Sequence, residues 1–399
     1  HRERLAFAPK SRWFRVCVAF LLVGSVFTVF LNTDAYSIGL RNVPGHVPYD
    51  AVHAVLNELL SVVLPFYLGA VVFRTSRDLR VLLITIVLAA LLYSPLQIVE
   101  MILSPQLHRW VYGFHQHAFL QVMRGESYRP MVFMAHGLAV AIFTMLALVS
   151  AAALFKAKVR VLRFSTAWIA SYLWVILILS KSLAALLYSM VAVPLVVFAS
   201  PRVQALAAAA LAGLLFAYPL LRANDLIPVE ALQSWAEDDY GSERARSMTF
   251  RFENEGRLLD RALERPWFGW GSYCRACVYE RGSGERSAIS IRDGAWIIRL
   301  GDHGIVGFVG AVGLLLFPLI ALVRRLKYVP RVSDRRLLAG LGLMVGFSAF
   351  DLIPNGDFTR LAFVLAGALW GCLSGVLQEA AKAMREKRAR VMVAREARW

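Results

Sequence analysis

Long apolar runs with almost no charge recur along this 399-residue chain. Several of them extend for about 18–25 residues, which is enough for a helix to cross a hydrocarbon core of roughly 30 Å. Backbone inside a bilayer has no water to bond with, so such runs must satisfy their hydrogen bonds internally, as helices do. The composition agrees, because 58% of the residues are hydrophobic, 18% are charged and the mean hydropathy is +0.56. We therefore predict an all-α polytopic membrane protein.

The apolar runs define ten expected spans. They are 13–31, 52–73, 79–103, 130–155, 166–180, 182–199, 203–221, 296–323, 337–350 and 360–377. We expect the first to be a span rather than a cleaved signal peptide, because it has no small-residue cleavage site. The chain then divides into 1–221 with seven spans, a large loop at 222–295 that contains short helices, 296–377 with three spans, and a basic tail at 378–399.

The basic residues lie mainly on one side of this arrangement. The net charge is +17, and more than half of the 44 Lys and Arg residues fall in alternate short segments and in the two ends of the chain. Cytoplasmic loops of membrane proteins carry such an excess of basic residues. We therefore expect both termini in the cytoplasm and the 222–295 loop outside a bacterial inner membrane. A charge that follows membrane topology in this way argues against nucleic-acid binding.

The 222–295 loop is too long to be a simple connector. It holds about half of the 27 acidic residues of the chain, and long loops without a function are uncommon. Residues 254–263 put Leu258, Leu259, Ala262 and Leu263 on one helical face, which predicts an amphipathic helix. A second outer loop, 104–129, is rich in aromatic residues and His, which is typical of a segment at the membrane interface.

Two short motifs follow the amphipathic helix. The first, Arg265-Pro-Trp-Phe-Gly-Trp-Gly-Ser272, combines a residue that stops a helix with two glycines that allow a tight turn. The second starts at Asp293-Gly294 and continues through Leu300-Gly301 to Gly304-Ile305-Val306-Gly307, at the start of a span.

Together with Arg251, these motifs resemble the O-antigen ligase and polymerase family over roughly residues 130–325. That family has an Arg, then a P-x-x-G-x-G turn, then an H-N-x-x-L segment that ends in a G-hydrophobic-hydrophobic-G sequence. The resemblance implies a membrane glycosyltransferase that uses a lipid-linked saccharide. Asp293 stands where the family has its candidate catalytic His, which suggests the polysaccharide polymerase branch rather than the lipopolysaccharide ligases.

Transfer from a polyprenyl-pyrophosphate sugar needs cations for the leaving pyrophosphate and a group that takes the proton of the acceptor hydroxyl. Arginine forks suit phosphate oxygens, and a carboxylate serves as a base. We predict Arg251 and Asp293 as the catalytic pair. The alternatives are a solvated loop charge for Arg251 and a helix N-cap for Asp293.

Five further residues are candidates for binding the pyrophosphate or the sugar. The family carries a Ser-Arg pair where this chain has Ser180-Lys181, so Lys181 is expected to contact phosphate, although simple snorkelling explains it equally well. His136, about two turns into the predicted fourth span, is a site candidate or a packing residue. The other three candidates are Arg129, Arg257 and Arg275.

No metal or other cofactor is expected. His108, His115 and His117 lie on an interfacial segment, and the chain has no paired-aspartate motif. Cys274 and Cys277 form a C-x-x-C sequence in an oxidising compartment, which favours a short disulfide over a redox site.

The expected partners are a polyprenyl-pyrophosphate-linked saccharide, a saccharide acceptor, membrane lipid and other envelope polysaccharide assembly proteins. The alternatives are an O-antigen ligase that acts on lipid A core, a flippase of the lipid-linked saccharide, and a scaffold subunit without enzymatic activity. A flippase would be built from two similar halves with helices broken at mid-membrane. The sequence has no such internal repeat.

Overall fold

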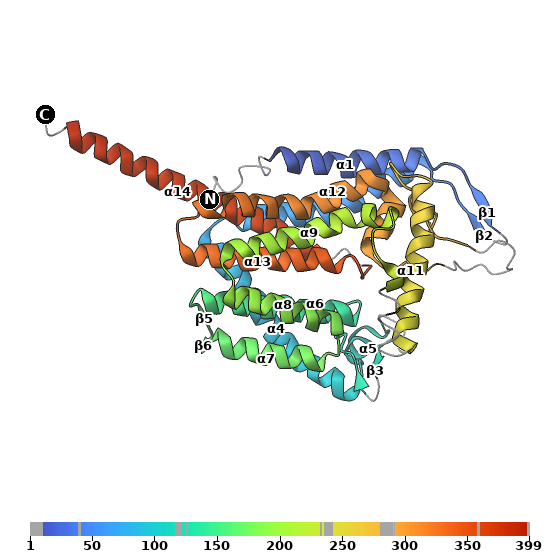
Figure 1. The fold of residues 1–399 in the computed structure, drawn as a ribbon, viewed down its shortest axis with the longest axis horizontal. Helices are drawn as coiled ribbons and strands as arrows, with labels where there is room; N and C mark the ends of the chain where they lie inside the picture. Colours follow the sequence, from blue (N-terminus) through green and yellow to red (C-terminus); the bar gives the residue numbers. More distant parts are fainter. Residues whose placement is uncertain are drawn as a thin grey trace. The chain divides into compact units, whose positions relative to one another are not determined.

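The computed structural model describes residues 11–38, 41–115, 122–124, 127–231, 234, 242–279, 290, 292–356 and 360–396. The chain is an all-α polytopic membrane protein with very little sheet (Figure 1). The helices are α1 (Arg12–Phe30), α2 (Pro48–Glu58), the π-helix η2 (Leu59–Val63), α3 (Leu64–Val72), α4 (Ser76–Leu103), α5 (Leu107–Tyr112), α6 (Gly137–Lys156), α7 (Thr166–Leu179), α8 (Leu183–Phe198), α9 (Pro201–Ala223), α11 (Ser242–Leu263), α12 (Ala295–Arg325), the 3-10 helix η4 (Leu326–Tyr328), α13 (Val332–Asp351) and α14 (Arg360–Glu396).

Three short antiparallel hairpins, which the sequence did not predict, join some of these helices. They pair β1 (Tyr36–Ile38) with β2 (Arg41–Val43), β3 (Met123–Arg124) with β4 (Ser127–Tyr128), and β5 (Arg160–Val161) with β6 (Phe164–Ser165). Each hairpin turns the chain between two helices.

Seven helical segments of the described chain are long and apolar enough to cross a membrane. They are α1, the continuous α2–η2–α3 segment, α4, α6, α9, α12 with η4, and α14. The other three predicted spans are helices too. However, α7 and α8 have only 14 and 16 residues, and the 20-residue α13 carries Asp334, Arg335 and Arg336 in its first turns.

The predicted start of the fourth span at 130 is wrong, because α6 begins at Gly137. The preceding residues turn sharply, with Val132 at a φ of +53°. The buried carboxylate of Glu100 accepts the backbone N–H groups of Met131 and Val132 at 2.8 and 2.7 Å. These bonds hold the segment as a loop. His136 is therefore the N-cap of α6, where its Nδ1 accepts the N–H of Leu138, and it does not lie two turns inside a span.

Contacts divide the chain into two units. Unit 1 comprises 1–68, 210–318 and 348–367, and unit 2 comprises 69–209, 319–347 and 368–399. In unit 1, α1 packs against α2 and against α12. The α12 contact is close because Gly310 and Gly313 leave room for Cys17 and Leu21 of α1. Phe66 is fully buried between Phe14 and Phe317.

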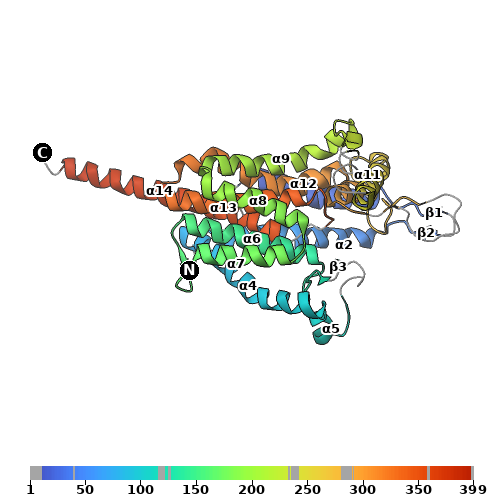
Figure 2. The ribbon, with the colours of Figure 1, turned by 60° about the horizontal axis from the view of Figure 1, so that its bottom comes forward.

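Unit 2 is built around α6, which contacts α4, α7 and α8 (Figure 2). Small residues again set the spacing of the helices. A side chain on Gly340 would meet Ala153 of α6, and one on Gly346 would meet Ala208 of α9. The buried hydrogen bond between Gln97 and Thr144 joins α4 to α6. Such close packing and hydrogen bonding hold helices together in a membrane, where lipid tails are as apolar as the side chains and the hydrophobic effect does not drive helices together.

Candidate functional site

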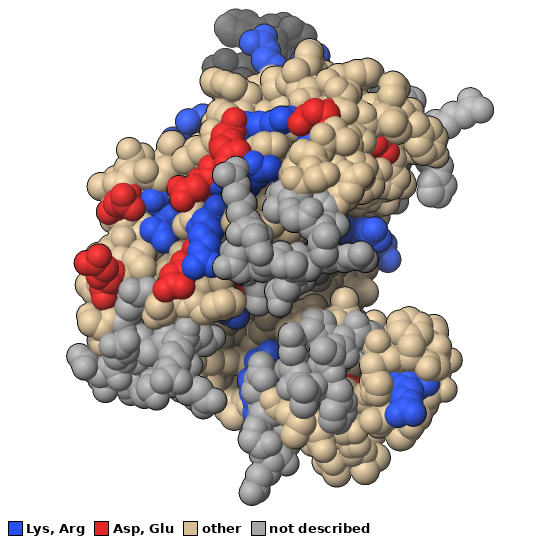
Figure 3. Space-filling model, turned by 90° about the vertical axis from the view of Figure 1, so that its right-hand side faces the viewer, with Lys and Arg blue, Asp and Glu red and all other residues tan. Residues whose placement is uncertain are grey.

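The amphipathic helix predicted at 254–263 is the last part of α11, which belongs to unit 1. Leu258, Leu259 and Ala262 are buried as expected, whereas Leu263 is exposed. Figure 1 shows α11 running across the ends of α9 and α12. Figure 3 looks onto this end of the molecule, where basic and acidic side chains lie intermingled. The loop therefore presents a folded, charged helix rather than an irregular connection.

The first motif, Arg265–Ser272, fits into a break in α12. At Gly304 the backbone leaves the helical conformation, with φ +64° and ψ −170°. The N–H groups of Ile305 and Val306 donate instead to the carbonyls of Pro266 and Trp267, at 2.7 and 3.1 Å. In return, the N–H groups of Trp270 and Gly271 donate to the carbonyls of Gly301 and Asp302, at 2.8 and 2.9 Å. The two sequence motifs are thus two halves of one backbone interlock.

Two glycines are required by this interlock. A Cβ on Gly304 would lie 2.4 Å from the carbonyl carbon of Trp267, and one on Gly269, at a φ of +70°, would lie 2.6 Å from the backbone of Asp302. Both positions combine a positive φ with backbone contact, which only glycine tolerates. These two glycines of the motifs therefore have a structural explanation.

Arg251 and Asp293, the predicted catalytic pair, lie together. The Nε of Arg251 on α11 is 3.6 Å from Oδ2 of Asp293, just before α12. Their side chains are 52% and 46% exposed, so a ligand can reach both. Gly294, at a φ of +88°, turns the chain into α12, and the N–H of Ala295 donates to the carbonyl of Asn355 at 2.8 Å.

Arg257 lies six residues after Arg251, on another side of α11, since a helix has 3.6 residues per turn. Its side chain is exposed. The structure thus places it on the same helix as the Arg251–Asp293 pair but does not bring it to that pair.

Glu255 was missed by the sequence analysis, although it lies one turn from Arg251. Its carboxylate accepts hydrogen bonds from Arg222 Nε at 3.2 Å, Tyr218 Oη at 3.3 Å and Trp296 Nε1 at 2.9 Å. Burial raises the pKa of Glu255 above its ordinary value, and these donors offset only part of that effect. In the sequence, Glu255 is simply one of the many acidic residues of a charged loop.

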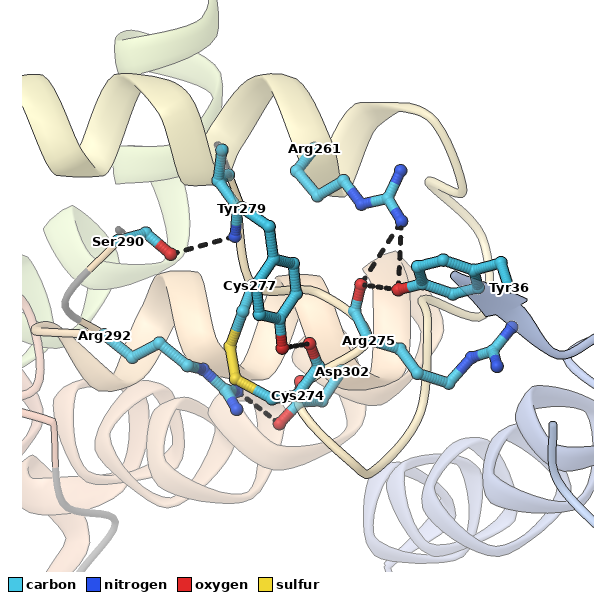
Figure 4. Close-up of a disulfide and its surroundings, with 10 residues drawn as sticks. Tyr36, Arg261, Cys274, Arg275, Cys277, Tyr279, Ser290, Arg292 and Asp302 are labelled. Carbon is cyan, nitrogen blue, oxygen red and sulfur yellow. Dashed lines mark hydrogen bonds and ion pairs between the residues drawn. A yellow bond between two sulfur atoms is a disulfide. The ribbon is translucent and has the colours of Figure 1, made fainter. Parts of the chain in front are cut away.

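Cys274 and Cys277 are joined by the predicted disulfide (Figure 4). The hydroxyl group of Tyr279 donates to the carbonyl of Cys274 at 3.1 Å, and the N–H of Val278 donates to Ser290 Oγ at 2.9 Å. Arg292 and Asp302 form an ion pair beside it. The disulfide closes a compact turn next to the interlock with α12.

Arg275, predicted to bind pyrophosphate, lies inside this turn and is fully buried. Its guanidinium donates to the carbonyls of Asp34 and Pro44 at 2.8 and 2.7 Å and to Asp34 Oδ1 at 3.2 Å. The prediction for Arg275 is therefore corrected: a buried guanidinium with these partners does not face a ligand. Burial raises the pKa of Asp34, but a backbone hydrogen bond and the charges of Arg265 and Arg275 outweigh this and hold the pKa below its ordinary value.

Two guanidinium groups lie close to the ring of Trp270. The Cζ atoms of Arg261 and Arg265 are 3.4 and 4.2 Å from the centre of its ring, and the indole N–H donates to the carbonyl of Arg261 at 2.7 Å. Arg265 also bonds to the carbonyl of Leu31 at the end of α1, at 3.0 Å. Stacking of this kind is favourable for a guanidinium over an indole face, so this contact ties the first motif to α11.

A buried ion pair joins α12 to the end of α2 in unit 1. Arg299 of α12 donates to both carboxylate oxygens of Glu58, at 2.7 and 2.5 Å, and His303 Nε2 is 3.6 Å from the same carboxylate. Glu58 ends α2, immediately before the π-helix η2. An isolated charge within a span is costly, so the pairing explains how these residues are accommodated.

Lys181, Arg129 and His136 belong to unit 2, whereas the candidate site residues described above belong to unit 1. Arg129 is buried, and its Nη2 donates to the carbonyl of Lys181 at 3.2 Å. The aliphatic stem of Arg129 occupies the space that a side chain on Gly137 would need. Lys181, at a φ of +52°, makes the predicted turn between α7 and α8 and exposes its side chain. The three predicted residues thus lie on neighbouring segments of one unit.

Within the described ranges, no three His, Cys, Asp or Glu side chains are grouped as metal ligands would be. His108 is buried, with its ring 4.6 and 4.7 Å from those of Tyr112 and Phe114, and its Nδ1 lies 2.9 Å from the carbonyl of Phe114. His117 lies outside the described residues.

No protein-family model matches the chain, and no curated protein matches it. Among solved structures, this protein is similar to one chain of a structure described as "Structural coordination of polymerization and crosslinking by a peptidoglycan synthase complex". The two chains are 17% identical, with a TM-score of 0.44, and the match covers 94% of this chain and 99% of the other.

Proposed function

We propose that this protein is a membrane glycosyltransferase that transfers saccharide from a polyprenyl-pyrophosphate-linked donor, most specifically a polysaccharide polymerase at the outer face of the inner membrane. The observation that carries the proposal is the Arg251–Asp293 pair. Among the ion pairs described, it is the one in which both side chains stay about half exposed. A cation and a carboxylate that solvent can reach, on a folded charged loop, match the needs of the reaction.

The proposed step is a single displacement with inversion at the sugar. The acceptor hydroxyl oxygen attacks the anomeric carbon, the bond from that carbon to the pyrophosphate oxygen breaks, and polyprenyl pyrophosphate leaves. Arg251 binds the pyrophosphate and stabilises the charge that develops on it. In doing so it releases Asp293, whose carboxylate then takes the proton of the acceptor hydroxyl. The step requires no metal ion.

Arg257 on α11 is proposed as a further cation for the saccharide-linked phosphates. For Lys181 of unit 2, the proposal keeps the contact with phosphate that the family resemblance implies. Arg129 and His136, also of unit 2, are proposed to contact the lipid-linked pyrophosphate or sugar. Each of these four assignments is tested by replacing the residue singly with Ala and measuring the apparent KM for the donor. An unchanged KM removes that residue from the binding site.

The catalytic assignments are tested with Arg251→Ala, Arg251→Lys and Asp293→Asn in purified protein. We expect Arg251→Ala and Asp293→Asn to lower the transfer rate by about 100-fold or more, as removal of a phosphate clamp or a general base does. Arg251→Lys should retain part of the rate, because it keeps the charge without the two-pronged donor. Asp260→Asn, an exposed acid on the same helix, is the matched control. Normal rates in all three site variants would refute the assignment.

A further inference from the structure

Glu255 joins three helices of unit 1 at one carboxylate. Oε2 accepts from Arg222 and Tyr218 near the C-terminal end of α9, and Oε1 accepts from Trp296 in the first turn of α12. The side chains of Glu255 and Arg222 are each only 12% exposed. Arg222 also donates from Nη2 to the carbonyl of Phe252 at 3.2 Å, which gives α11 a second bond to α9.

The bonds of Glu255 to α9 and α12, called the Glu255 junction below, lie next to Arg251. The two residues are four apart on α11, so they lie one above the other on one face. Arg251 pairs with Asp293, and Glu255 bonds to Trp296, three residues later. Adjacent turns of α11 therefore contact the same short stretch of chain, one through an exposed pair and one through a buried bond.

Among the α11 side chains that the structure describes, the buried ones are Asn254, directly before Glu255, and three apolar residues after it. Leu258, Leu259 and Ala262 all follow Glu255, towards the C-terminal end. Glu255 and Arg222 thus bond α11 to α9 one turn away from Arg251. We expect loss of those bonds to let Arg251 shift relative to Asp293.

We propose that Glu255 is a positioning residue, which sets the separation of Arg251 and Asp293 by tying α11 to Arg222 and Trp296. The inference rests on the proposed function, because it assumes that this separation matters for glycosyl transfer. Glu255 itself does not contact the reacting atoms: its oxygens are already engaged by Arg222, Tyr218 and Trp296.

The Glu255 junction needs an ionised carboxylate, because a protonated acid pairs poorly with a guanidinium. The titratable groups that face Glu255 are Arg222 and Tyr218 of α9, while α12 contributes the neutral Trp296. Since burial raises the pKa of Glu255, it takes up a proton at a higher pH than an ordinary glutamate. As the pH falls through that raised pKa, the bond to Arg222 weakens and the transfer rate should fall with it.

The test compares Glu255→Gln with wild type and with Glu253→Gln, an exposed acid on the same helix. We expect Glu255→Gln to lower kcat about ten-fold or more, since small displacements of a reacting group are costly, while KM changes less than about two-fold. In wild type, kcat should fall as the pH is lowered, and in Glu255→Gln this fall should begin at a lower pH. Arg222→Gln should lower kcat similarly, and the double variant should be no slower than either single variant. Normal kcat and an unshifted acid decline in Glu255→Gln would overturn the proposal.

A second measurement does not depend on activity. Cysteines introduced as Arg251→Cys and Asp293→Cys should be joined by a short bifunctional thiol reagent, and adding Glu255→Gln should lower the crosslinking rate several-fold, whereas adding Glu253→Gln should not. An unchanged crosslinking rate would overturn the positioning role. If wild-type protein transfers no sugar but crosslinking still depends on Glu255, the proposed function fails and the positioning of α11 stands.

Discussion

Arg251 and Asp293 gain little stability from each other. Ion pairs between solvent-exposed side chains contribute about 0–1 kcal/mol, because water screens them and ordering the side chains costs entropy. A pair as exposed as this one is therefore poorly explained by stability alone. Replacing either residue should leave the unfolding temperature nearly unchanged, even where it abolishes transfer. This separation between stability and rate is the mark of a residue that acts on a ligand.

The Cys274–Cys277 disulfide should behave in the opposite way. Closing a loop of this length stabilises a fold by about 2 kcal/mol in the chain-entropy model. We expect Cys274→Ser with Cys277→Ser to lower the unfolding temperature in a non-reducing buffer. Reductant should lower the unfolding temperature of wild type and leave the double variant unaffected, since Cys17 and Cys372 are buried and unpaired. Equal unfolding temperatures for wild type and the double variant would contradict this view.

At the candidate site, the sequence indicated some of the residues but not most of the partners that the structure gives them. Arg251 and Asp293 were chosen from motif order, and the structure brings them together. The burial of Arg275 was not predictable, because its partners Asp34 and Pro44 are more than 200 residues away in the chain. The same is true of Glu58 and Arg299, each of which falls inside an apolar run.

At the scale of elements, the break in α12 and the Arg265–Ser272 turn depend on each other. The break exposes carbonyl and N–H groups that a continuous helix would satisfy, and the turn supplies partners for four of them. Unsatisfied backbone groups are especially costly in a membrane protein, so neither element is expected to be stable without the other.

Gly304→Ala tests this interlock. A residue other than glycine at that φ and ψ costs about 1–3 kcal/mol, and its Cβ would also meet the backbone of Trp267. We expect a clear drop in the unfolding temperature in detergent. Gly213→Ala is the matched control, because nothing lies within 4 Å of a Cβ there, and it should be neutral or stabilise α9 by up to about 1 kcal/mol. Equal unfolding temperatures for the two variants would refute the interlock.

Helices were predictable because apolar runs of span length have few other structures open to them in lipid. The start of α6 was not, because the bonds that hold residues 131 and 132 as a loop come from Glu100 on another helix. The hairpins between helices were missed for a related reason: strands of two or three residues carry too short a pattern to be recognised.

At the scale of the whole molecule, the proposed function requires the 222–295 loop on the outer side of the membrane. It also requires the C-terminal end of α14 on the cytoplasmic side. We expect an impermeant maleimide to label Glu230→Cys in intact cells and to label Met384→Cys only after the membrane is opened. Both positions are exposed, and the native cysteines are buried or disulfide-bonded. Labelling of Met384→Cys in intact cells, with Glu230→Cys protected, would invert the topology and contradict the proposed site.

The most direct measurement is transfer by the purified protein in nanodiscs. It would be given the lipid-linked repeat unit of its own host, with EDTA present, and the products would be separated on a gel beside those of Arg251→Ala. We predict a ladder of saccharide chains that forms despite EDTA and is lost in Arg251→Ala. Well-folded protein that makes no product, yet moves the lipid-linked saccharide across a vesicle bilayer, would contradict the account and identify a flippase.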